Sequence, residues 1–195
     1  MSQSNHSPTP DTAKAPHFAL PQALRAALAR HRSMHVDIAS QTLVLHDGGR
    51  PLACYPVSTG VNGPGERDGS GCTPRGWHRV RLAIGAGCPV GTVFRGRRPT
   101  GEVYTPELAA RFPERDWVLT RILWLTGLEP GRNRGGACDT LRRFIYIHGC
   151  PDSEPMGVPR SHGCIRMRNA DLFDLFPRVA AGTLVEIRAD GDGDA

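Results

Sequence analysis

The chain's 195 residues are enough for one domain with a buried core, and its hydrophobic share of 39% is normal for a globular protein. Its 23 glycines and 17 prolines are too many for a helical bundle and favour a turn-rich, mainly β domain. The longest apolar runs, such as 122–125, are far shorter than the ~18 residues of a transmembrane helix. The composition therefore excludes a protein with membrane-spanning helices and predicts no membrane partner.

The net charge of +5 comes almost entirely from arginine, because Lys14 is the only lysine. Surfaces that bind nucleic acids combine a stripe of basic residues with interleaved aromatic ones. Here the basic residues form only short turns, at 95–98 and 132–134. The charge therefore indicates a solvated basic surface and no nucleic-acid partner, and a substrate that carries carboxylates fits it equally well.

Both ends of the chain are polar. We expect a flexible tail and a short helix over 1–34, one folded domain over 35–189, and a disordered tail over 190–195. Residues 1–21 lack the basic start, apolar core and cleavage site of a secretory signal. This predicts a cytoplasmic protein if Met1 is the native start, and a periplasmic one if a leader has been removed. In the first case free thiols are expected at all six cysteines, positions 54, 72, 88, 138, 150 and 164.

Apolar periodicity predicts the secondary structure in chain order. A short helix at 21–31 precedes a β-meander over 35–58, with a hairpin turn at the Asp-Gly-Gly of 47–49. Glycine-rich loops are expected at 60–76 and 127–140. Further strands are expected at 77–84, 117–125, 143–147 and 183–188. Residues 85–116 form the longest excursion, which contains a helical stretch at 106–111 and is a candidate for a lid over a substrate.

A second helix is expected to begin near Asn169, because Asn169 or Asp171 can cap it. Its buried face is expected to consist of Leu172, Phe173, Leu175 and Phe176. This helix directly follows the run Ser-His-Gly-Cys-Ile-Arg-Met at 161–167, which is the most informative segment of the chain.

The run contains a candidate nucleophile, Cys164. A free cysteine has a pKa of ~8.5, so it needs a nearby base to react as a thiolate. His162 is close in sequence, but His148 ends a predicted core strand, which holds its ring rigidly and makes it the stronger candidate. Gly149 and Gly163 let the backbone pass closely and leave amide groups free to bind an oxyanion. Together these residues supply what a cysteine acyl-transfer enzyme requires.

The spacing resembles the catalytic signature of the L,D-transpeptidase (YkuD-like) family, in which a His-Gly pair precedes a Ser/Thr-His-Gly-Cys-Ile/Val-Arg run. Here Cys164 follows His148 by 16 residues. The resemblance extends upstream to Tyr-Pro-Val-Ser-Thr-Gly at 55–60 and Thr-Pro-Arg-Gly-Trp at 73–77, and it covers about 35–188. It implies a β-sandwich-like fold with a few short helices and with the nucleophilic cysteine in a loop at the mouth of a cleft.

The resemblance also implies a substrate, the peptidoglycan tetrapeptide stem, cut between the L-centre of a diamino acid and the terminal D-alanine. Cys164 is then the nucleophile and His148 the base, with the carbonyl of Gly149 orienting the imidazole. No metal or cofactor is required, and carbapenems are expected to acylate the thiol. The remaining assignments are His162 and Ser161 as supports of the site, the amides of Gly163 and Cys164 as the oxyanion hole, and Arg166, Thr73 and Trp77 as loop or substrate contacts.

Three alternatives stay open. An acyl-enzyme that reacts with an amine gives transpeptidation, whereas water gives L,D-carboxypeptidation, as in the recycling of peptidoglycan. The run at 161–167 does not distinguish these two fates, nor does it show which histidine is the dominant base. A non-catalytic module that binds polyanions is a further alternative, although it needs neither the cysteine nor the histidine. A zinc site built from Cys138, Cys150, Cys164, His148 and His162 is also an alternative. Zinc ligands usually include a close Cys-x2–4-Cys pair, and this sequence has none.

Overall fold

The computed structural model describes residues 19–189, so the tails expected at the two ends lie mostly outside it. No helix in this part of the chain is long and apolar enough to cross a membrane. The helices are α1 (Gln22–Leu28), α2 (Pro106–Arg111) and α3 (Asn169–Leu175), with short 3-10 turns η1 (Gly136–Cys138) and η2 (Phe176–Arg178). The strands are β1 (Arg32–Asp37), β2 (Thr42–Asp47), β3 (Arg50–Ser58), β4 (Gly76–Ile84), β5 (Thr92–Arg95), β6 (Arg98–Val103), β7 (Val118–Gly127), β8 (Tyr146–Gly149), β9 (Ile165–Met167) and β10 (Leu184–Arg188).

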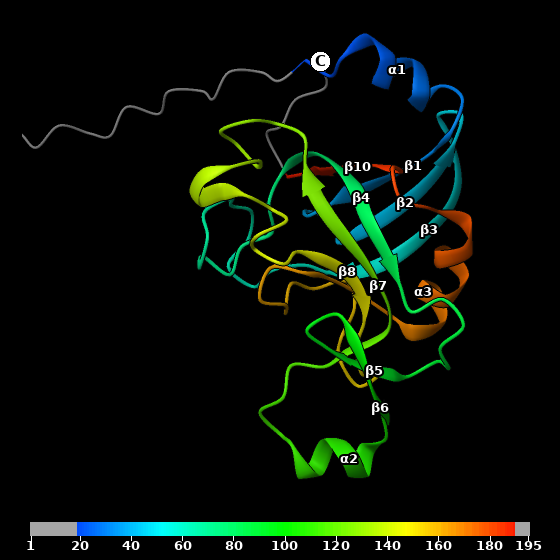
Figure 1. Cartoon of the computed structure of the whole chain (residues 1–195), viewed down its shortest axis with the longest axis vertical. Coiled ribbons are helices and arrows are strands. Elements are labelled where there is room, and N and C mark those ends of the chain that lie inside the picture. The colour runs from blue at the N-terminus through cyan, green and yellow to red at the C-terminus, as the bar shows by residue number, and fades with distance from the viewer. Residues whose placement is uncertain (1–18, 190–195) are drawn as a thin grey trace, which may run out of the picture.

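All the described strands belong to one sheet, in the order β4-β10-β1-β2-β3-β9-β8-β7-β5-β6 (Figure 1). Strand β4 also pairs with β7, so the sheet folds back on itself and encloses the core between its two halves. Strands β1, β2 and β3 form the expected antiparallel meander. The parallel pairs are β1 with β10 and β8 with β9. The prediction of a mainly β fold with a few short helices is confirmed.

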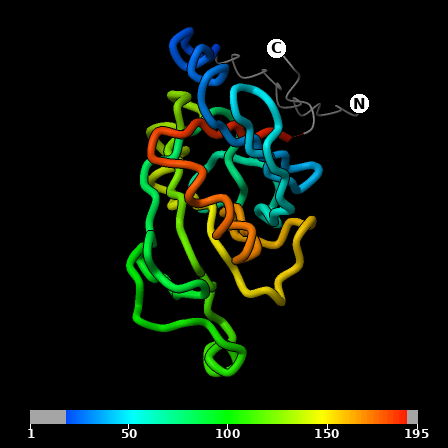
Figure 2. The backbone as a smooth tube through the Cα atoms, turned by 90° about the vertical axis from the view of Figure 1, so that its right-hand side faces the viewer, coloured from blue at the N-terminus to red at the C-terminus, as the bar shows by residue number. Residues whose placement is uncertain are grey.

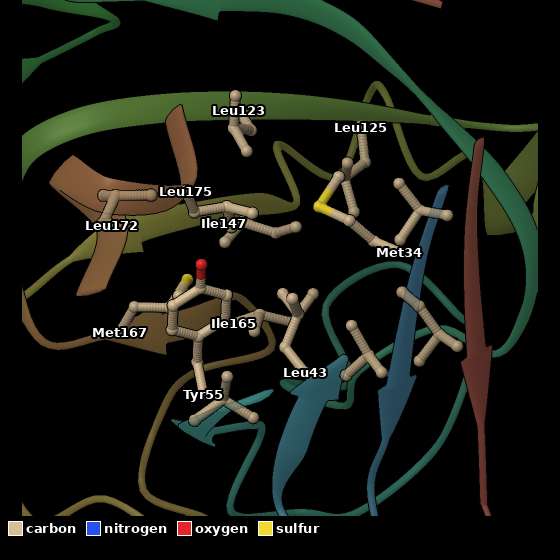
Figure 3. Packing of buried hydrophobic residues seen from close by; sticks show 14 of the residues in the cluster. Met34, Leu43, Tyr55, Leu123, Leu125, Ile147, Ile165, Met167, Leu172 and Leu175 are labelled. Carbon is tan, nitrogen blue, oxygen red and sulfur yellow. The ribbon is translucent and has the colours of Figure 1, made fainter. Parts of the chain in front are cut away.

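The core is filled by every second side chain of the central strands, because successive residues of a strand point to opposite faces. In Figure 3, side chains from β7, β8 and β9 meet those of β1, β2 and β3. Two leucines of α3, Leu172 and Leu175, close this cluster and are fully buried. The other fully buried members that the figure labels are Met34, Leu43, Leu123, Leu125, Ile147, Ile165 and Met167.

Helix α3 begins where it was predicted but differs in its buried face and in its cap. Phe173 is 49% exposed, because it lies about 100° around the helix from Leu172. The residue before the first turn is Arg168, whose side chain makes no capping hydrogen bond. Asn169 is buried and binds the Cys150 carbonyl instead, at 2.8 Å, so neither Asn169 nor Asp171 caps the helix.

Residues 85–116 are a structured lobe rather than a loop. They contain β5, β6 and α2, and both views show this part extending from one end of the molecule (Figures 1 and 2). Strand β5 pairs with β7, and the residues around α2 pack on Trp117. The helix at 106–111 is confirmed. Strand β5 was missed because it has only four residues, and β6 because it contains a proline and a glycine.

The strand predicted at 143–147 begins only at Tyr146. Phe144 has a φ of 55°, a left-handed conformation that ends the preceding turn and is incompatible with a strand. The Arg143 guanidinium instead reaches the 60–76 loop, where it donates to the Cys72 carbonyl at 2.6 Å.

Neighbouring positions on α3 allow a matched test of the core. We expect Leu172→Ala to lower the free energy of unfolding by about 2–5 kcal/mol, because it removes a fully buried side chain. Phe173→Ala should cost less than about 1 kcal/mol, since this ring is half exposed and its main partner is the Arg121 guanidinium at 5.3 Å. Denaturant unfolding measures both values, and equal costs would contradict the described face of the helix.

Candidate active site

The candidate site is assembled where β8 and β9 run side by side in parallel. Their register pairs Ile147 with Ile165 and His148 with Arg166. Paired residues of neighbouring strands point to the same face of a sheet, and successive residues point to opposite faces. Because the two isoleucines are buried in the core, His148 and Arg166 face the other side of the sheet. The alternation that builds the core thus also selects the residues of the site.

His148 is held rigidly, with 1% of its surface exposed. Its Nδ1 lies 2.8 Å from the carbonyl oxygen of Gly149. A carbonyl only accepts hydrogen bonds, so Nδ1 carries the proton and Nε2 is left as the basic nitrogen. Burial lowers the pKa of His148 below its ordinary value of 6.5, although the Gly149 carbonyl and the Asp116 charge oppose the shift. The imidazole is therefore neutral near pH 7, as a general base must be.

Glycine is required at position 149 because β7 passes very close to β8 there. A Cβ at Gly149 would lie 2.8 Å from the Leu119 carbonyl oxygen. Strand β7 bulges at the next residues, where Thr120 has a φ of 68°. The Thr120 hydroxyl donates to the side-chain oxygen of Asn169, which ties the bulge to the start of α3. Bulges of this kind often re-aim side chains beside active sites.

Cys164 is half-buried and directly precedes β9. Its sulfur accepts the Tyr146 backbone N–H at 3.4 Å and donates to the Phe144 carbonyl at 3.5 Å. Cys164 also packs against the side-chain cluster that contains Tyr146, which lies two residues from His148 on β8 with ring centroids 6.5 Å apart. The thiol and the imidazole therefore both lie on the Tyr146 side of the sheet. Burial raises the pKa of Cys164 to about 12. The thiol is therefore protonated at neutral pH, and a base must remove its proton during attack.

The loop before Cys164 is fixed by short polar contacts. The Ser161 hydroxyl donates to the Cys164 carbonyl at 2.5 Å and accepts the Gly163 N–H at 3.1 Å. Thr73 is buried and donates to the Gly163 carbonyl at 2.9 Å. Gly163 has a φ of +116°, and a Cβ there would lie 2.9 Å from the Cys72 carbonyl oxygen. Both its conformation and its surroundings therefore demand glycine.

These contacts correct the expectation that the Gly163 amide is free to bind an oxyanion. Its hydrogen is directed to Ser161, whereas the Cys164 amide has no hydrogen-bond partner within residues 19–189. The Cys164 amide is thus the available donor beside the sulfur. Thr73 also accepts the Gly60 N–H at 2.8 Å, so its hydroxyl is fully engaged in holding the loop.

Arg166 is paired with acidic residues that sequence reasoning did not identify. Its guanidinium lies 2.8 Å from Asp116 Oδ1 and 3.4 Å from Glu154 Oε2. The second Asp116 oxygen lies 3.5 Å from Nδ1 of His162, whose side chain is 76% exposed. Arg166 and His162 therefore share one carboxylate. Arg166 makes the contacts of a residue that organises the loop, and His162 flanks the site from the solvent side.

Asp116 connects the 85–116 lobe to the catalytic loop. It lies two residues before β7 and also lines an open pocket of about 930 Å³ that the lobe forms. Burial alone would raise the pKa of Asp116, but the Arg166 guanidinium, together with His148 and His162 in their protonated forms, outweighs burial and lowers it. Asp116 is therefore a carboxylate at neutral pH. No sequence motif marks it, because it lies 50 residues before Arg166.

Comparison with known proteins agrees with this arrangement. The profile of the YkuD family, the L,D-transpeptidase catalytic domain, matches residues 31–187. The chain belongs to this family. The probable L,D-transpeptidase YbiS of Escherichia coli K12 is 41% identical over 46 residues, which are 24% of this chain and 15% of YbiS.

Solved L,D-transpeptidase structures show the same fold. An L,D-transpeptidase from Mycobacterium smegmatis gives a TM-score of 0.51 at 21% identity, over 82% of this chain and 59% of that one. L,D-transpeptidase 3 from Mycobacterium tuberculosis, in complex with a faropenem-derived adduct, gives a TM-score of 0.50 at 17% identity, over 80% and 60% of the two chains. The L,D-transpeptidase domain described here thus spans well under two thirds of these relatives.

Two other sequence-based hypotheses concern Trp77 and a zinc site. Trp77 lies on β4, where its backbone N–H donates to Glu129 Oε1 at 2.5 Å, and its role as a substrate contact stays a prediction. Within residues 19–189, no group of three or more His, Cys, Asp or Glu side chains is placed to hold a metal ion, which counts against the zinc alternative. Cys150 is instead a buried thiol whose pKa burial raises to about 12.

The charge of Asp116 predicts a change in the pH profile. The Asp116 carboxylate raises the pKa of His148, so Asp116→Asn should lower that pKa further. The acidic limb of kcat/KM, which lies below pH 6.5 in the wild type, should then move to lower pH. Loss of the Arg166 contact should also reduce kcat about 10-fold at pH 8.

Glu154→Gln is the matched control for this variant. It removes a carboxylate from the same Arg166 guanidinium, but Glu154 is not among the charges that shift the pKa of His148. Its acidic limb should therefore coincide with that of the wild type. If the acidic limb of kcat/KM in Asp116→Asn stays in place or moves to higher pH, the electrostatic role of Asp116 is contradicted.

Proposed function

We propose that this chain is a cysteine acyl-transfer enzyme that cuts peptidoglycan tetrapeptide stems between the L-centre and the terminal D-alanine. The observation that carries the proposal is the neutral pair on one face of the sheet. Cys164 has a raised pKa and His148 a lowered one, so the thiol is protonated and the imidazole unprotonated at neutral pH. This is the starting state of general-base activation of a nucleophile.

In the proposed reaction His148 Nε2 takes the thiol proton as Cys164 Sγ attacks the carbonyl carbon of the L-centre. The oxyanion of the tetrahedral intermediate accepts a hydrogen bond from the Cys164 amide. The intermediate then collapses, the bond to D-alanine breaks, and His148 returns the proton to the departing amine. A thioester on Cys164 remains, and the Gly149 carbonyl stabilises the imidazolium that forms transiently.

The second half of the reaction sets the product. Attack by the amine of another stem peptide or D-amino acid gives a transpeptidation product, and attack by water gives a tripeptide. Both routes use the same thioester and the same base. We take the family's transpeptidase chemistry as the primary proposal, and L,D-carboxypeptidation without crosslinking as the second outcome.

Two incubations test the proposal. One contains free tetrapeptide, and the other contains disaccharide-tetrapeptide with a D-amino-acid acceptor, with products analysed by mass spectrometry. Exchange products or dimers support transpeptidation. Tripeptide alone in both incubations supports the carboxypeptidase, and release of no D-alanine in either contradicts the proposed function.

Substitutions at the proposed nucleophile and base should abolish D-alanine release. We expect Cys164→Ser and His148→Ala each to reduce turnover at least about 1000-fold, because the acyl-enzyme cannot form without the pair. His162→Ala should reduce it less than about 10-fold, since this side chain is largely exposed and contacts only Asp116. Unchanged thermal unfolding shows that each variant still folds. Wild-type rates for Cys164→Ser would refute the assignment of the nucleophile.

Carbapenems should acylate the thiol. The strained carbonyl of the β-lactam is attacked as the stem carbonyl is, and a related enzyme has been solved with a faropenem-derived adduct. Intact-mass analysis should show one added carbapenem on the wild type and on Cys54→Ser, which lacks an exposed thiol outside the site. Cys164→Ala should show none. An adduct that persists in Cys164→Ala would place the reactive thiol elsewhere.

A further inference from the structure

Arg97 lies in the turn that joins β5 to β6, where the sequence indicated only a short basic turn. Gly96 and Arg97 have φ values of 56° and 66°, so this two-residue turn places an arginine in the left-handed region. Hairpin turns of this type strongly prefer glycine or asparagine at such positions, because other residues are strained there. The turn therefore holds its arginine in a fixed place at an energetic cost.

The Arg97 side chain folds back onto an aromatic wall of the sheet. Its guanidinium carbon lies 4.6 Å from the ring centre of Trp124 and 4.8 Å from that of Phe144. Its Nη1 donates to the Tyr146 hydroxyl at 3.1 Å. Stacking on two rings and a hydrogen bond to a third fix the orientation of the guanidinium plane.

No carboxylate lies within ion-pairing distance of Arg97 in the described part of the chain. Two acidic residues of the same lobe are paired with other arginines, Glu102 with Arg115 at 2.9 Å and Asp116 with Arg166 at 2.8 Å. Arg97 is half-buried and thus partly removed from water. A partly desolvated cation of this kind is suited to an anionic ligand.

The same aromatic wall contacts the nucleophile. Tyr146 donates its backbone N–H to the Cys164 sulfur at 3.4 Å and accepts the Arg97 hydrogen bond through its hydroxyl. Phe144 accepts from the sulfur through its carbonyl and stacks on Arg97 through its ring. A single tyrosine therefore spans the distance between the thiol and the guanidinium.

We infer that Arg97 binds a carboxylate of the acyl-donor peptide, namely the terminal carboxylate of the leaving residue. This inference rests on the proposed function. The terminal carboxylate lies one residue beyond the carbonyl that Cys164 attacks. One extended residue separates the two carbon atoms by about 3.5 Å. A planar guanidinium can bind it through two parallel hydrogen bonds. Other carboxylates of a stem peptide, such as the side-chain carboxylate of a diamino acid, share this chemistry and are separated by the test.

The test compares peptides that differ in one carboxylate. The donor tetrapeptide ends in D-alanine or in D-alaninamide, and its third residue is either diaminopimelate or lysine. For the wild type, we expect kcat/KM for the free acid to exceed that for the amide at least about 10-fold, as charge-assisted hydrogen bonds predict. In Arg97→Gln the acid should lose about 10- to 100-fold while the amide changes less than about 3-fold. Arg97→Lys should retain part of the preference.

Arg98→Gln is the matched control, because it removes the same charge from an exposed side chain one residue away. It should keep the wild-type preference for the free acid. An equal loss for acid and amide in Arg97→Gln would show a purely structural role and overturn the inference. A lost preference for diaminopimelate over lysine, with the acid-to-amide ratio unchanged, would move the contact to the other carboxylate and also overturn it.

Binding separates this inference from the proposed function. Calorimetric titration of Cys164→Ala with each peptide needs no turnover. Tighter binding of the acid than the amide, abolished by adding Arg97→Gln, supports the carboxylate site even if no D-alanine is released by the wild type. Equal binding of acid and amide to Cys164→Ala, together with equal kcat/KM values in the wild type, overturns the inference while leaving the proposed reaction intact.

Discussion

The parallel pairing of β8 with β9 is the constraint on which the site depends. It sets Ile147 beside Ile165 in the core and, by alternation, His148 beside Arg166 on the opposite face. If the pairing of these strands shifted by one residue, the core-facing and site-facing residues would exchange faces, and the imidazole would be buried among leucines. The hydrophobic core thus fixes the positions of His148, the proposed base, and of Arg166 beside it.

Electrostatics divides the site into a neutral centre and a charged rim. The proposed nucleophile and base are both uncharged at rest, because burial disfavours a thiolate and an imidazolium alike. The charges lie further out, in the ion pair of Arg166 with Asp116, which His162 flanks. Because Asp116 belongs to the 85–116 lobe, this rim joins the lobe to the loop that carries Cys164. A proton can therefore move between thiol and imidazole in a field that two segments distant in sequence create together.

The sequence predicted those parts of the molecule in which local pattern and tertiary structure agree. The meander, the helix at 106–111 and the start of α3 followed from turn residues and periodicity. Strands β5 and β6 did not, because both are short and depend on tertiary pairing, β5 with β7 and β6 with β5. Residues of the run at 161–167 were recognisable because they are adjacent in sequence. Asp116 and Arg97 were not, since their partners lie far along the chain and only the folded sheet brings them together.

Closure of the sheet affects how readily copies of this chain associate through their strand edges. With β4 bonded to both β10 and β7, β6 stands at the end of the pairing order and has β5 as its one strand neighbour within residues 19–189. Unpaired edges invite strand addition from another copy and so favour aggregation. β6 carries Arg98, Pro99 and Gly101, a charge, a residue without an N–H and a flexible break within one short strand. The lobe that places Arg97 against Tyr146 thus also presents an outer strand that is poor at recruiting a neighbour.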